Sequence, residues 1–277
     1  MKFVVATHNE GKLPEIVTIV EGVLGQRAVD MELVSAGSLG LPDPVETGVT
    51  FEENALLKAR DVAKRTGLPA LADDSGLIVD VMGRAPGILS ARWSGSHGDD
   101  TANMNLLLAQ LSDIPDNKRT ARFCCAAALV VPVSGGHGSA KSRADEGVLI
   151  REARSGQANS ADGCFQETVR LGEMKGVVIR APRGGHGFGY DPIFVPDDQP
   201  ADHAVGCVHG DVGAVKGSTR MNMDYDASIN RREGVRRRTL PLTSAEMTPE
   251  EKNAISHRCK AFTALAPAIG ELLRTVQ

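Results

Sequence analysis

Residues 68–77 read LPALADDSGL, where an apolar run from Leu68 to Ala72 leads into two adjacent carboxylates, Asp73 and Asp74. Successive side chains on a strand point to opposite faces, so the two acids would not share one pocket if the strand continued through them. We therefore expect the strand to end here, with one acid anchoring a turn and the other facing a cleft. An ordinary Asx-type turn would explain the stretch equally well.

The composition is that of a globular protein with one large domain or two lobes. The chain has 277 residues, of which 42% are hydrophobic and 24% charged, and its formal net charge is −4. Because there is no overall basic field, nucleic acid is not the partner we expect. The five cysteines form no C-x-x-C pair, which argues against a zinc site or a disulfide framework. No apolar span is long enough to cross a bilayer, so we expect a cytoplasmic protein.

Apolar runs alternate with stretches of helical periodicity, which indicates an α/β fold. Capping-box patterns at Thr50–Glu53 and Thr248–Glu251 mark the starts of two helices. A kink or break is expected near Pro267 in the last helix. The predicted strands are residues 3–6, 31–35, a strand ending at 73–74, 77–81, 122–131, 146–151, 175–180 and 193–195, and the predicted helices are 13–24, 50–66, 101–111 and two segments after 248.

The stretch THNEGK, residues 7–12, lies between a predicted strand and a predicted helix. Backbone N–H groups at a helix N-terminus attract anions. Thr7 and Asn9 can donate side-chain hydrogen bonds, and Lys12 adds a point charge suited to phosphate. The spacing differs from that of a P-loop. An ordinary strand–helix turn remains an alternative on these residues alone.

Several carboxylates lie between Glu46 and Asp74 in the sequence, and carboxylates are the ligands that Mg²⁺ prefers. Glu53 is expected to cap the helix that starts at Thr50, which makes it a poor ligand candidate. Glu46 lies on the loop before that helix and Asp74 at a strand end, so both can point into a cleft. A magnesium site that uses these two residues is the hypothesis.

Two later stretches carry side chains suited to a nucleotide. Residues 184–194, GGHGFGYDPIF, bring glycines that allow a close approach, aromatic faces of Phe188 and Tyr190 for stacking on a base, and Asp191 as an acceptor. A glycine-rich turn with core aromatics is the alternative. In EKNAISHR, residues 251–258, donors concentrate near a helix end and suit a purine edge or a phosphate equally well; these are Lys252, His257 and Arg258.

With these clusters the chain resembles the inosine triphosphate pyrophosphatases. The resemblance covers most of residues 1–131, 175–195 and 244–274, and it rests on the stretches ATHNEGK, ETGVTFEENALLKA, LPALADDSGLIVD, APGILSARWSG, GFGYDPIF and AEMTPEEKNAISHR. It implies hydrolysis of ITP, dITP and XTP to the monophosphate and pyrophosphate, which cleanses the nucleotide pool. It also implies Mg²⁺, a homodimer, and a long mixed sheet flanked by helices in two lobes around an active-site cleft.

The resemblance also implies roles for individual residues. Asp74 would accept a proton from the attacking water, and Ser75 would touch substrate without acting as nucleophile. Apart from the resemblance, we expect Asp73 to brace the turn or to support the site from behind. The triphosphate would be held by Thr7, His8, Asn9, Glu10, Gly11 and Lys12, the metal by Glu46 and Asp74, and the nucleotide, mainly its base, by Phe188, Gly189, Tyr190, Asp191, Lys252, His257 and Arg258.

Some features of the chain depart from that family, and the sequence also leaves alternative functions open. Residues 134–168 and 197–240 look like insertions into a single domain that spans 1–277, and the arginines at 231–238 are more typical of a solvated surface than of a nucleic-acid site. His8 occupies a variable position of the T-x-N-x-x-K motif. The alternatives are a pyrophosphatase for modified pyrimidine nucleotides and a nucleotide-binding sensor that does not hydrolyse its ligand.

Overall fold

The structure is a computed structural model that describes residues 1–8, 12–133, 164–200 and 240–275. A six-stranded mixed sheet forms its centre, in the order β2-β1-β3-β4-β5-β6. β1 is parallel to β2 and β3, and the other neighbours are antiparallel, so the predicted mixed sheet is confirmed. The strands are β1 (Lys2–Val5), β2 (Glu32–Ser35), β3 (Ala70–Val79), β4 (Thr120–Val133), β5 (Cys164–Val178) and β6 (Phe194–Pro196).

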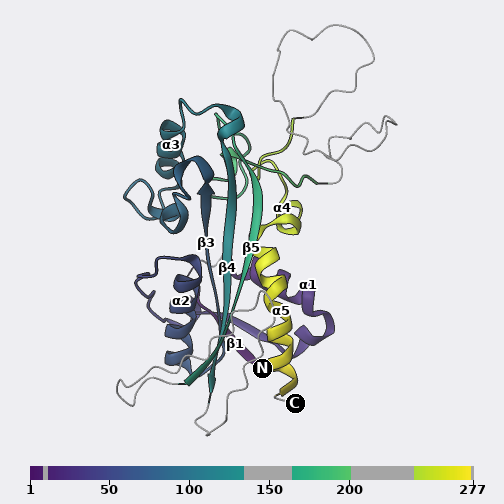
Figure 1. The fold of residues 1–277 in the computed structure, drawn as a ribbon. Helices are drawn as coiled ribbons and strands as arrows, with labels where there is room; N and C mark the ends of the chain where they lie inside the picture. Colours follow the sequence, from purple (N-terminus) through teal and green to yellow (C-terminus); the bar gives the residue numbers. More distant parts are fainter. Residues whose placement is uncertain (9–11, 134–163, 201–239, 276–277) are drawn as a thin grey trace, which may run out of the picture.

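Helices cover both faces of this sheet (Figure 1). The α-helices are α1 (Lys12–Leu24), α2 (Phe51–Thr66), α3 (Asp100–Gln110), α4 (Pro249–Ile255) and α5 (His257–Thr275). The 3₁₀ helices are η1 (Gly25–Asp30), η2 (Gly37–Leu39), η3 (Asp80–Met82), η4 (Gly87–Arg92), η5 (Asp116–Lys118) and η6 (Asp191–Ile193). None of the helices in the described part of the chain is long and apolar enough to span a membrane.

The alternation of side chains along the strands divides the core into layers. Phe3 and Leu71 pack with α1 and α5 on one face, whereas Val4 and Ala72 pack with α2 on the other. A further apolar cluster forms around α3 at the far end of the long strands, where it includes Leu77 of β3. Figure 1 shows α3 toward one end of β3, β4 and β5, and α1, α2 and α5 toward the other end. This arrangement agrees with the two lobes that were expected.

The expectation that a strand ends at Asp73 and Asp74 is wrong. β3 runs on to Val79 and pairs with β4 at every residue from Ala70. Of the separate strand expected at 77–81, residues 77–79 belong to β3 and residues 80–81 to η3. No turn follows the two acids. The strand can pass through them because each carboxylate has cationic partners on its own face of the sheet.

Other boundaries also differ from the sequence-based prediction. β5 begins at Cys164 and pairs with the end of β4, so residues 164–168 belong to the sheet and not to an insertion. α5 is continuous through Pro267, and the predicted break is absent from it. The expected strand at 146–151, the arginines at 231–238 and most of both proposed insertions lie outside the described residues. Both capped helix starts are present, at Thr50 and Thr248.

Candidate active site

The site forms where β1 stops short of the middle of β3. β1 pairs with β3 only at Ala70 and Leu71, so no strand in the described ranges covers that edge of β3 beside Asp73–Ser75. Lys12 at the start of α1 reaches this edge. Groups from both faces of the sheet can therefore approach one ligand here, although Asp73 and Asp74 point in opposite directions.

Asp74 lies on the α2 face, where it meets Glu46 through a shared lysine. Lys58 Nζ is 2.9 Å from Asp74 Oδ1 and 3.0 Å from Glu46 Oε1. Asn54 donates to Asp74 Oδ2 at 3.3 Å, and its own carbonyl accepts from the backbone N–H of Gly48 at 2.8 Å. The fully buried Asn54 thus holds the loop that carries Glu46 against Asp74. The structure brings the two predicted metal ligands together.

The pKa values of Asp74 and Glu46 shift in opposite directions, although both carboxylates contact Lys58. Burial raises the pKa of Asp74, and the contacts with Lys58 and Asn54 offset only part of that effect. For Glu46, burial opposes ionisation, but Lys58 and Arg92 outweigh it and lower the pKa. Burial likewise disfavours the Lys58 ammonium, yet Asp74, Asp73 and Glu46 together raise its pKa. The less acidic carboxylate, Asp74, is the better candidate for a proton acceptor.

This pair of carboxylates suits a hard divalent cation. One ammonium already contacts an oxygen of each, so Glu46 and Asp74 can face a common positive charge. Among the described residues no cluster of three or more Asp, Glu, His or Cys could hold a metal ion. A cation held here would complete its shell from water and ligand oxygens, which is the habit of Mg²⁺.

Asp73 lies on the opposite face and is buried in an ion-pair network. Arg258 donates to its Oδ2 from Nη2 at 3.1 Å and from Nε at 3.2 Å, and Lys12 Nζ is 3.9 Å from Oδ1. Ser75 also donates to Asp73, at 3.1 Å. Burial alone would raise the pKa of Asp73, but Lys12, Arg258 and Lys58 lower it far below the usual range. Asp73 therefore anchors helices to the strand and braces no turn.

The glycine-rich loop before β6 is ordered by Asp191. Its buried carboxylate accepts from the Phe188 backbone at 2.9 Å and from Lys252 Nζ at 2.5 Å. Phe188 is 53% exposed, and Lys252 Nζ lies 5.1 Å from the centre of its ring. Phe188 keeps a face for stacking, whereas Tyr190 does not. Tyr190 is only 3% exposed and donates its hydroxyl to Ser90 O at 2.9 Å, so the expected stacking role of Tyr190 is wrong.

His257 and Arg258 begin α5 and are both buried. Burial first, and then Arg258 and Lys252, lower the pKa of His257 well below 6.5, so its ring is neutral. The ring stacks on Phe123 with centres 5.1 Å apart, and its buried Nδ1 has no hydrogen-bond partner among the described residues. Arg258 contacts Glu15 as well as Asp73, so its guanidinium is occupied by carboxylates.

The predicted phosphate loop is described only at its ends. Thr7 is buried, and the ring of His8 contacts Leu41 O at 2.6 Å and the carboxylate of Asp43. His8 thereby joins this loop to the one that carries Glu46. Lys12 points toward Asp73, as described above. Asn9, Glu10 and Gly11 lie outside the described residues, and their phosphate-binding role stays a prediction.

Lys58, which was not among the residues expected from the sequence, lies between Asp74 and Glu46 at the centre of the site. A signal for it existed, because Asn54 and Lys58 are four residues apart in a predicted helix and hence on one face. That face is otherwise lined by Phe51, Ala55 and Ala59. Two polar side chains on an otherwise apolar helical face indicate that both have polar partners in the fold.

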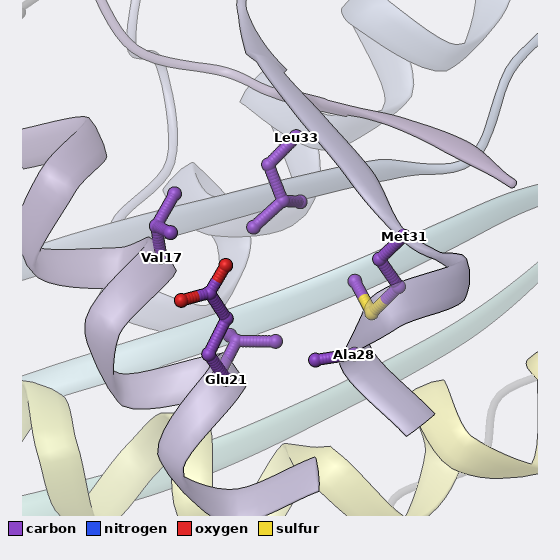
Figure 2. A pocket seen from close by; sticks show the side chains of 6 residues that line it. Val17, Glu21, Ala28, Met31 and Leu33 are labelled. Atoms are coloured by element: carbon purple, nitrogen blue, oxygen red, sulfur yellow. The ribbon is translucent and has the colours of Figure 1, made fainter. Parts of the chain in front are cut away.

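A pocket elsewhere in the structure shares no residue with this site. It is formed by α1, η1 and β2, has a volume of about 160 Å³ and is shown in Figure 2. Glu21 is the one charged residue in its lining, which otherwise consists of Val17, Val20, Ala28, Met31 and Leu33. Its mostly apolar wall offers nothing suited to a polyanion.

Comparison with known proteins shows the family of the chain. The family model described as Ham1 family matches residues 3–208 and 197–268. The chain belongs to the Ham1 family. A relative from Bifidobacterium longum, named dITP/XTP pyrophosphatase, is 58% identical over 278 residues and covers 99% of this chain and 100% of its own length. A Streptomyces coelicolor relative of the same name is 42% identical, covering 98% of both chains.

Solved structures of Ham1 proteins share the fold. The nucleoside-triphosphatase, or dITP/XTP pyrophosphatase, of Mycobacterium abscessus is 40% identical with a TM-score of 0.57, covering 96% of this chain and 100% of its own. The HAM1 protein of Coxiella burnetii is 30% identical with a TM-score of 0.63, covering 98% and 99%. The family resemblance and the mixed α/β fold expected from the sequence are thereby confirmed.

Proposed function

We propose that this chain hydrolyses non-canonical purine nucleoside triphosphates, namely dITP, ITP and XTP, to the monophosphate and pyrophosphate. The observation that carries this proposal is the pairing of Glu46 with Asp74 through Lys58 at the open edge of β3, where Lys12 approaches from the other face. Full-length relatives named dITP/XTP pyrophosphatase support the substrate class. Removing such nucleotides would cleanse the nucleotide pool.

In the proposed reaction a water molecule attacks the α-phosphorus. A new bond forms between phosphorus and the water oxygen, the bond to the bridging oxygen of the β-phosphate breaks, and pyrophosphate leaves. Asp74 takes the proton of the water, a role that its burial-raised pKa favours. Lys12 and Lys58 supply positive charge on either side of the strand. A bound divalent cation, for which we propose Mg²⁺ held by Glu46 and Asp74, would neutralise charge on the polyphosphate.

Base recognition is assigned to the region around Phe188 and α4. The exposed ring of Phe188 can stack on the base, and Lys252 beside it can donate to an oxygen. A donor facing the 6-oxo group of hypoxanthine or xanthine would be left facing the amino group of adenine. Unpaired buried polar groups make such discrimination large. Guanine also carries a 6-oxo group, so a different contact has to exclude it.

The test is pyrophosphate release from dITP, ITP and XTP compared with GTP, ATP, dUTP and methylated pyrimidine triphosphates, with and without Mg²⁺. We expect turnover of the first three that requires the metal and is at least tenfold faster than that of the canonical nucleotides. Preference for a pyrimidine would favour the modified-pyrimidine alternative. Tight binding without pyrophosphate release would favour a sensor.

Three further properties belong to this proposal. We propose a homodimer that acts in the cytoplasm, where its nucleotide substrates are made and used, and a single catalytic domain that spans 1–277 with insertions between β4 and β5 and after β6. Light scattering coupled to gel filtration tests the dimer. Cell fractionation tests the location, and activity after removal of residues 201–239 tests whether that segment is an insertion.

A further inference from the structure

Arg92 lies at the candidate site, next to Glu46, although its sequence context predicted no role for it. Its Nη1 lies 3.5 Å from Glu46 Oε2, whereas Lys58 contacts the other oxygen of the same carboxylate at 3.0 Å. Charges therefore alternate across the site in the order Asp74, Lys58, Glu46 and Arg92. The Arg92 side chain remains 33% exposed, more than the 13% of Lys58, so it is the member of this row most open to a ligand.

The short helix that carries Arg92 is held tightly on β3. In η4, the hydroxyl of Ser90 accepts from the backbone N–H of Leu77 at 2.9 Å and donates to Gly87 O at 2.6 Å. Gly76 makes this approach possible, since a Cβ there would lie 2.4 Å from Gly87 O. The segment that carries Arg92 is thus packed against β3, the strand that bears Asp74.

The same helix is attached to the loop assigned to the base. Tyr190 donates its hydroxyl to Ser90 O at 2.9 Å, two positions before Arg92. The tyrosine ring is buried, so this hydrogen bond links the loop that carries Tyr190 to η4. The guanidinium of Arg92 therefore lies on a segment anchored to both the metal-side strand and the base-side loop.

A divalent cation drawn to Glu46 would compete with Arg92 for that carboxylate. Mg²⁺ takes carboxylate oxygens as ligands and shares its shell with phosphates, and a planar guanidinium matches phosphate oxygens with two parallel hydrogen bonds. We propose that Arg92 is a further substrate-binding residue that contacts the polyphosphate of the nucleotide. The inference rests on the proposed function. It adds a positively charged side chain to the site, to which neither the motifs nor the family comparison assigned a role.

Competitive inhibition by inorganic triphosphate, with ITP as substrate and saturating Mg²⁺, tests this contact without involving the base. Arg92→Gln should raise the inhibition constant about ten- to hundredfold, the usual effect of losing a hydrogen bond to a charged group. Arg92→Lys should restore part of it, because charge returns without the fork. Arg180→Gln is the matched control, since Arg180 pairs with Asp116 through a different part of the fold.

Calorimetric titration of the nucleotide-free protein with Mg²⁺ separates ligand binding from mere orientation of Glu46. If Arg92 contacts phosphate, Arg92→Gln should leave the Mg²⁺ affinity unchanged or increased, since a competing cation has gone. A Mg²⁺ affinity that falls, together with an unchanged inhibition constant for triphosphate, would overturn the proposal. Folding of each variant is checked by its urea midpoint.

Failure of this inference is distinguishable from failure of the proposed function. Suppose that Glu46→Gln loses Mg²⁺ binding, that the wild-type protein hydrolyses ITP, and that triphosphate inhibits Arg92→Gln as strongly as it inhibits the wild type. Only the role of Arg92 is then refuted. If wild-type protein releases no pyrophosphate from any purine nucleotide, the proposed function fails first. Tyr190→Phe should raise the triphosphate inhibition constant less than Arg92→Gln, because Ser90 still holds η4 to Leu77.

Discussion

Asp73 and Asp74 are neighbours in β3, yet their carboxylates contact opposite faces of the sheet. Asp73 accepts from Arg258 of α5 at 3.1 Å, and Asp74 accepts from Lys58 of α2 at 2.9 Å. The positive charge of Lys58 nevertheless acts on both acids: it helps to lower the pKa of Asp73 and offsets part of the burial that raises the pKa of Asp74. Asp73 thereby compensates the buried charge of Arg258, whereas Asp74 contacts Lys58 and is the proton acceptor that we propose.

Replacing Asp74 with Asn tests this proposed role. The amide has nearly the shape of the carboxylate but cannot accept the proton of water. We expect kcat for ITP to fall about 10²- to 10⁴-fold, while ITP binding in a titration stays close to that of the wild type. A kcat near the wild-type value would remove Asp74 from the chemistry.

Replacing Asp73 with Asn should instead act on folding. The change leaves the guanidinium of Arg258 buried with one of its two carboxylate partners lost, and breaking a buried pair typically costs about 3–5 kcal/mol. Urea denaturation at neutral pH measures the loss. Lys2→Met, which removes an exposed pair with Glu32, is the control and should change stability little. A loss no larger than that of the control would show that the Asp73 pair is not structural.

Local signals in the sequence were enough for much of this site. The caps at Thr50 and Thr248 place α2 and α4, and the position of Glu46 on the loop before α2 brings it to Asp74. These relations depend on residues close in the chain or on one strong motif. They could be predicted because helix capping and apolar periodicity are read over a few residues.

The errors arose where distant residues decide the outcome. β3 passes through two acids because Arg258, 185 positions away, and Lys58 compensate their charge. Tyr190 can be buried because its hydroxyl donates a hydrogen bond to Ser90 O, 100 positions away. A single sequence gives no measure of such contacts. A buried aromatic and a stacking aromatic therefore looked alike, and a strand that carries charges looked like a strand end.

His257 should make the protein less stable in mild acid. Burial, with help from Arg258 and Lys252, lowers its pKa in the folded state, whereas the unfolded chain takes up a proton below about pH 6.5. Stability from this group is therefore complete above that pH and falls by up to about 1.4 kcal/mol for each pH unit below it. Asp73, whose pKa is lowered from 3.8, contributes a similar loss only in stronger acid.

The variant His257→Gln isolates that contribution, since Gln stays neutral in both states. Urea denaturation between about pH 7 and pH 5 should give a shallower decline of stability than in the wild type. His97→Gln, at an exposed position, is the control and should keep the wild-type slope. Equal slopes in all three proteins would refute a buried neutral histidine.

Gly76→Ala should disturb the site through packing alone. An added Cβ would lie 2.4 Å from Gly87 O and 2.6 Å from Ser90 Oγ, so η4 has to move away from β3 and carry Arg92 away from Glu46. Overpacking of this kind typically costs about 1–3 kcal/mol, and we expect kcat/KM for ITP to fall more than the folded fraction does. Gly22→Ala, on α1 with nothing within 4 Å of its added Cβ, is the control and should keep both stability and activity. Full activity in Gly76→Ala would mean that the position of η4 does not matter to the reaction.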